Sequence, residues 1–144
     1  MAIFTMPKSY DDVKKPIPMP AGIYSFITKE TPKLEENKKK DGHNIVLDFV
    51  TFGDPDPEMN GRGFRYWIAM PKPGDDDKRT GTGQTFTDFK MSRIQKIVEA
   101  LGGRVEGMNV DLPDTVQCKF NVIQTINENT QDIENQLEGD PLPL

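Results

Sequence analysis

The chain has 144 residues, a formal net charge of -5 and 35% hydrophobic residues, which is the size and composition of one globular domain with a lean core. Its single cysteine, Cys118, excludes an internal disulfide and a zinc site built from several thiolates. No apolar run is long enough for a signal-peptide core or a membrane-spanning helix, so we expect a cytoplasmic protein with no membrane partner.

The negative charge is unevenly distributed along the chain. Residues 1–104 carry 17 basic and 15 acidic side chains, whereas residues 105–144 carry 1 basic and 8 acidic side chains. A mildly basic body can attract a polyanion even when the whole chain is acidic, because the local field decides the contact.

The chain opens with an arm and a strand. Four prolines among charged residues predict an extended arm over residues 1–20. The β-branched and aromatic run Gly22–Thr28 predicts the first strand. A charged hairpin loop is expected over residues 33–42, since it ends in Asp-Gly. Residues 43–52 alternate between apolar and polar, which predicts the second strand.

Alternation continues over residues 64–70, which predicts a third strand that places Arg65 and Trp67 on one face. Residues 71–84 hold no apolar side chain apart from prolines, so a mobile loop is expected. Apolar residues then recur at helical spacing from 86 to 101, behind a capping box formed by Thr85 and Asp88.

Two further strands are predicted, over residues 105–110 and 116–126. The acidic, proline-tipped segment 127–144 predicts a flexible C-terminal tail, leaving 21–126 as the folded domain. An acidic tail of this kind would compete with a polyanion for the basic body, so its deletion is expected to raise affinity.

The residues that catalysis needs are scarce. His43 is the only histidine and directly follows a turn, which argues against a nucleophile activated by an imidazole. The acidic loop at residues 54–65 has Met59 and Arg65 where a calcium loop needs glycine and a carboxylate. Residues 81–83 lack the lysine of a phosphate-binding loop. We therefore expect no metal, no cofactor and no enzymatic activity.

Basic side chains lie where a surface that follows a nucleic-acid backbone needs them, and an aromatic side chain stands among them. Trp67 can stack on a base beside the guanidinium of Arg65, with Tyr24 or Phe52 as further stacking candidates. A charged, solvated loop beside a half-buried tryptophan is the alternative interpretation. The candidate nucleic-acid-binding residues are Lys38, Lys39, Lys40, Arg62, Arg65, Trp67, Lys72, Lys78 and Arg79.

Three strands, a helix and two strands is the element order of the OB-fold, a five-stranded barrel that binds oligonucleotides on strands two and three. Segments 19–24 (MPAGIY), 42–49 (GHNIVLDF) and 100–103 (ALGG) resemble a family of small phage replication-region proteins that bind single-stranded DNA. The resemblance implies a mainly β, OB-fold-like barrel with one helix between strands three and four.

The last seven residues are similar to the acidic, apolar-tipped tails with which single-strand-binding proteins contact replication partners, although the chain ends in Leu instead of Phe. The partner-binding candidates are Asp140, Pro141, Leu142, Pro143 and Leu144.

The expected function is sequence-tolerant binding of single-stranded DNA in phage replication or recombination, with the tail contacting other replication or recombination proteins. The oligomeric state, including a homo-oligomer, stays open. A phage structural or adaptor protein that uses the β-domain for protein contacts is the alternative. A metal-dependent nuclease is a third hypothesis, motivated only by the acidic loops.

Overall fold

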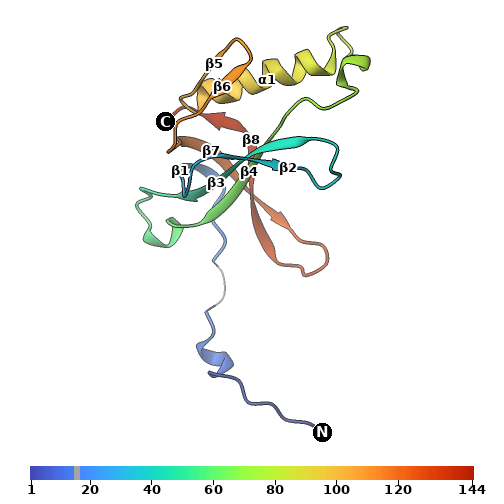
Figure 1. Ribbon diagram of the computed structural model, residues 1–144. Coiled ribbons are helices and arrows are strands. Elements are labelled where there is room, and N and C mark those ends of the chain that lie inside the picture. Colours follow the sequence, from blue (N-terminus) through green and yellow to red (C-terminus); the bar gives the residue numbers. More distant parts are fainter. Residues whose placement is uncertain (15–16) are drawn as a thin grey trace.

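The computed structural model describes residues 1–14 and 17–144, and shows an antiparallel sheet with a helix over one end (Figure 1). Its strands are β1 (Gly22–Thr28), β2 (Lys33–Glu36), β3 (His43–Thr51), β4 (Gly63–Ala69), β5 (Arg104–Glu106), β6 (Asn109–Asp111), β7 (Gln117–Ile126) and β8 (Ile133–Leu142). The helix is α1 (Phe86–Ala100), and three short 3-10 turns are η1 (Tyr10–Asp12), η2 (Pro57–Met59) and η3 (Asp75–Asp77).

Strand β3 organises the main sheet because it pairs on both edges. One edge pairs with β4 over most of its length. The other edge pairs with β2 through residues 43–46 and with β1 through residues 49–51. Pro32 has no N–H to donate to a ladder and lies between β1 and β2, which are separate strands for that reason. The sheet continues from β1 to β7 and β8.

The expectation of a mainly β protein with one helix is confirmed, but the expected five-stranded barrel is wrong in strand number, and the described residues form no closed barrel. Both β4 and β8 are edge strands, and no ladder joins them in the described part of the chain. The sequence pattern did not predict β2 or β8. The strand expected at 105–110 is a separate hairpin, β5–β6, which turns at Gly107 and packs against α1.

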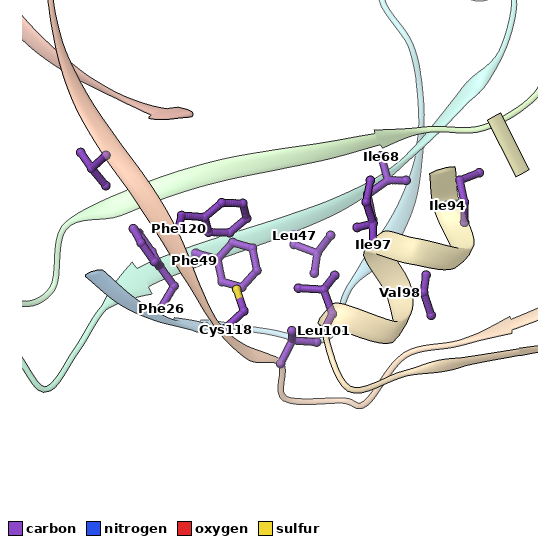
Figure 2. Packing of buried hydrophobic residues seen from close by; sticks show 12 residues of the cluster. Phe26, Leu47, Phe49, Ile68, Ile94, Ile97, Val98, Leu101, Cys118 and Phe120 are labelled. Atoms are coloured by element: carbon purple, nitrogen blue, oxygen red, sulfur yellow. The ribbon is translucent and has the colours of Figure 1, made fainter. Parts of the chain in front are cut away.

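The core lies between α1 and strands β1, β3, β4 and β7 of the sheet (Figure 2). The ring of Phe26 in β1 meets three others edge to face, with centroids 5.5 to 6.1 Å apart: those of Phe49, Phe64 and Phe120. Tyr24 is partly buried and packs against the same cluster, so the inner face of β1 serves the core, and stacking by Tyr24 stays a prediction.

The predicted helix is confirmed. It begins after Thr85, whose hydroxyl accepts a hydrogen bond from the backbone N–H of Asp88 at 3.1 Å. Its buried side chains, Ile94, Ile97 and Val98, belong to the core cluster (Figure 2). The chain leaves the helix through Gly102–Gly103, and a side chain at Gly103 would collide with the carbonyl oxygen of Asp111.

The predicted flexible tail over residues 127–144 is wrong for most of its length, because residues 133–142 form β8. This strand pairs with β7 from Ile126–Ile133 up to Asn121–Glu138, and resumes at Lys119–Leu142 beyond a bulge. Leu137 packs on the core and Pro141 is buried. The domain therefore extends beyond residue 126, and the acidic segment is structural.

The N-terminal arm is exposed over residues 1–14, where η1 is its one short turn. Its far end belongs to the body, because Met19 is buried. The Met19 N–H donates to Asn135 Oδ1 at 2.9 Å, and its carbonyl accepts from Gln124 and Asn135. The arm over 1–20 thus ends against the β7–β8 hairpin, while residues 15–16 lie outside the described part.

Candidate nucleic-acid interface

Trp67 is a large aromatic side chain on the outer face of the sheet, and it is 56% exposed. Its neighbour in the ladder is Val46, which is buried although its strand position faces outward. Three surface hollows meet at this tryptophan, toward the β2–β3 turn, toward α1 and toward β8. An aromatic ring that lies on a sheet and is exposed to solvent on its other side is suited to stack on a flat ligand.

The first hollow lies between Trp67 and the β2–β3 turn, has a volume of about 420 Å³, and is called the turn-side hollow below. It is lined by Glu35, Glu36, Asn37, Lys38, Asn44, Val46, Arg65 and Trp67. The sequence pattern predicts a loop here, yet β2 makes the hairpin longer, and Lys38 lines the same hollow as the tryptophan. Cation and ring therefore share one concave surface.

The β2–β3 turn is held in a defined shape by its own polar groups. Asn37 Nδ2 donates to Asp41 Oδ1 at 2.7 Å, and the Asp41 N–H donates to Asn37 Oδ1 at 3.2 Å. Lys40 adopts a left-handed conformation, with φ of 57°. Lys38, Lys39 and Lys40 are exposed, and none of the ion pairs within residues 1–14 and 17–144 involves them.

Arg65 is placed beside Trp67 as expected, but its charge is already engaged. Its Nε donates to Asp48 Oδ1 at 2.8 Å and its Nη2 to Asp48 Oδ2 at 3.3 Å. Glu35 Oε2 lies 4.0 Å from Nη1. The hydrogen bond from Arg65 lowers the pKa of Asp48, so the pair stays ionised near neutral pH. Arg65 is a positioned guanidinium with two carboxylate neighbours.

Lys72 lies against the same turn, because its ammonium contacts Asp41 Oδ2 at 3.0 Å. The loop that it begins is anchored, although sequence analysis expected a mobile loop over 71–84. Asp75 in η3 is 1% exposed, accepts from the Lys72 N–H at 2.9 Å and pairs with Lys90 of α1 at 2.7 Å. The loop has no apolar side chain apart from prolines, and the buried, hydrogen-bonded carboxylate of Asp75 anchors it instead.

Two more candidate cations follow that anchor. Lys78 lies at the start of α1, because its carbonyl accepts from the Phe86 N–H at 2.9 Å. Arg79 bridges to Thr85 and donates from Nη1 to the carbonyl of Gly83 at 2.9 Å. Both side chains are exposed.

Arg62 is not brought together with the other candidates. It precedes β4 and donates from Nε to the carbonyl of Glu58, at the end of the β3–β4 hairpin opposite the β2–β3 turn. Gly63 and Ala69 are six residue steps apart along β4, a span of about 20 Å. Arg62 can therefore serve only a ligand that extends along the whole of β4.

The partner-binding candidates are divided between strand and terminus. Asp140 and Leu142 belong to β8, and Pro141 is buried. Asp140 pairs with Arg93 of α1 at 3.2 Å. Only Pro143 and Leu144 follow the strand, and the side chains of Leu142 and Leu144 are exposed.

The acidic residues serve turns. In the loop before β4, Asp54 accepts from the Asp56 N–H and Asp56 from the Glu58 N–H, at 2.9 and 3.0 Å. No group of three histidine, cysteine or acidic side chains within the described residues could hold a metal ion. No helix there is long and apolar enough to cross a membrane.

Sequence reasoning missed the helix side of the interface. Phe86, Phe89 and Arg93 of α1 line a cavity together with Trp67 and Tyr66 of β4. The missed signal was local: Phe89 lies off the helical stripe formed by Ile94, Val98 and Leu101, so it is not needed for the core and is 49% exposed.

No protein-family model and no curated protein matches this chain. The case for its function therefore rests on the surface around Trp67.

Proposed function

We propose that this chain is a non-enzymatic, sequence-tolerant single-stranded-DNA-binding protein of phage replication or recombination, acting in the host cytoplasm. One observation carries the proposal: Trp67 is 56% exposed on the outer face of the sheet and shares the turn-side hollow with Lys38. Base–aromatic stacking accepts every base, and lysines neutralise phosphates without reading sequence.

The charge balance of the interface supports weak sequence readout and strong salt dependence. Arg65 is compensated by Asp48 and Glu35 in the centre, whereas Lys38, Lys39 and Lys40 at the rim are exposed and form no ion pair within the described residues. The side chains of the rim lysines are flexible. They can therefore contact the phosphate backbone of DNA without requiring a fixed base-pair geometry.

The test is a titration of labelled oligothymidine, about 16 nucleotides long, followed by fluorescence anisotropy at several salt concentrations. We expect log K to fall with log salt at a slope of about -0.7 for each phosphate contact. Absence of binding at low salt contradicts the proposal. Cleavage of the same oligonucleotide on addition of magnesium would support the nuclease hypothesis.

An adaptor or structural role is the second candidate, favoured by the exposed apolar side chains of the N-terminal arm, among them Met1, Ile3 and Phe4. Such side chains are typical of protein contacts. Indifference to oligothymidine combined with arm-dependent self-association would support this role.

A further inference from the structure

A second hollow opens on the other side of Trp67, between β4 and the first turns of α1. This helix-side cavity has a volume of about 420 Å³, which is within the range of small-ligand sites. It is lined by Tyr66, Trp67, Ile68, Ala69, Thr80, Phe86, Phe89, Lys90, Arg93, Ile94 and Ile97. Its walls are therefore aromatic or aliphatic, with cations from one helix.

Two of its aromatic walls are open to solvent. Trp67 is 56% exposed and Phe89 is 49% exposed, and they come from different elements, β4 and α1. Phe89 is in the first turn of α1, which the Thr85 cap holds in place. Aromatic side chains exposed on two sides of one cavity indicate a site for a flat ligand.

The cations beside the cavity differ in availability. Lys90 is engaged with the buried Asp75 at 2.7 Å. Arg93 pairs with Asp140 at 3.2 Å, and because both of these side chains are more than half exposed, a phosphate can replace the carboxylate at little cost. Lys78, on the chain that hydrogen-bonds to Phe86, adds positive charge on the same side.

We infer that the helix-side cavity is a second base-binding site, which takes one unstacked nucleobase against Phe89 while Arg93 binds the adjacent phosphate. The inference rests on the proposed function, since Trp67 belongs to both hollows and a strand stacked on it can continue from Lys38 toward α1. The aromatic walls and the arginine, which can exchange its carboxylate for a phosphate, suit a flat, anionic ligand. They suit an aliphatic side chain less well.

The test moves the only tryptophan of the chain from position 67 in β4 to position 89 in α1, on the opposite wall of the cavity. In the double variant Trp67→Phe/Phe89→Trp, binding of unlabelled oligothymidine should quench the fluorescence at position 89, while a labelled oligonucleotide reports binding by anisotropy. Binding without quenching overturns the inference and leaves the proposed function standing. Absence of binding to the unmodified protein overturns both.

A second pair of variants keeps the inference testable if the double variant misfolds. Phe89→Ala should weaken oligothymidine binding about 5- to 100-fold, as expected for one lost stacking contact. Met91→Ala is the matched control, because Met91 is an equally exposed apolar residue of α1 that lines a different hollow, and its affinity should not change. If Phe89→Ala binds oligothymidine as tightly as Met91→Ala does, the inference is overturned.

Discussion

Arg65 and Asp48 face each other directly across β3 and β4, with Nε 2.8 Å from Oδ1 and Nη2 3.3 Å from Oδ2. This paired geometry fixes the guanidinium plane beside the indole of Trp67 but leaves little of its charge for a ligand. With Arg65 beside both Asp48 and Glu35, the centre of the proposed interface carries no free positive charge, and the exposed lysines lie at its rim.

Replacing Asp48 by asparagine should therefore strengthen DNA binding. Asp48→Asn removes the compensating charge and frees Arg65 for a phosphate, so oligothymidine affinity should rise and the salt slope should steepen by about 0.7. The matched control is Asp111→Asn, which releases Arg104 on the separate β5–β6 hairpin with the same charge change. Equal gains in both variants would attribute the effect to total charge alone.

Trp67→Ala should weaken oligothymidine binding by roughly 1 to 3 kcal/mol, because one stacking contact is lost. The fold should survive, since the indole lies outside the core cluster. Ile23→Ala is a suitable control: Ile23 is an exposed residue on the outer face of β1, away from the hollows around Trp67. A loss of folding in Trp67→Ala would assign the ring a structural role.

The buried Cys118 provides the folding control for every variant. Burial raises the pKa of its thiol to about 12, so the folded protein should resist thiol reagents at neutral pH and react only when it opens. Rapid labelling of a variant at neutral pH would show that its core has opened.

Deletion of residues 128–144 should now abolish folding instead of releasing an inhibitory tail. The deletion removes β8, exposes the edge of β7, and takes Leu137 from the core. We expect fast thiol labelling of Cys118 in this variant. Deletion of only Pro143 and Leu144, which follow β8, should leave labelling slow. A folded variant lacking 128–144 that binds DNA more tightly would restore the autoinhibitory picture.

The raised pKa of Tyr66 predicts that the protein loses stability at high pH. Burial, assisted by the charge of Asp140, raises the pKa of its hydroxyl from 10.0 to about 12. The folded state therefore binds this proton more tightly than the unfolded state. The resulting contribution to the free energy of unfolding is complete below pH 10 and is lost as pH rises toward 12. Denaturant unfolding of Tyr66→Phe should show a smaller decline over that interval than the unmodified protein. An identical decline would contradict the burial of the hydroxyl.

Strands and helix with strong periodicity could be predicted from the sequence, as for Gly22–Thr28 and the helix behind Thr85. β8 could not, because Ile133 and Leu137 are its few large apolar residues before the bulge, and its stability comes from long-range pairing with β7. Whether the sheet closes into a barrel likewise depends on pairing between distant strands, which no local sequence pattern encodes.

The candidate site, too, could be predicted from the sequence only in part. Trp67 could be identified because alternation places it on one face of its strand with Arg65, and the lysines because they form a charged run before an Asp-Gly turn. The engagement of Arg65 by Asp48 depends on register between two strands, and the anchoring of the loop by Asp75 depends on a lysine 15 residues away on α1. The helix-side cavity needs the docking of α1 beside β4, which exists only in the folded chain.

The fluorescence of Trp67 in the unmodified chain tests the central claim most directly, since this is the only tryptophan and it lies where the hollows meet. Titration with unlabelled oligothymidine at low salt should quench this fluorescence to a saturating value, and added salt should restore it as the complex dissociates. Unchanged tryptophan fluorescence under conditions where anisotropy shows the oligonucleotide bound, or no binding at all, would contradict the account.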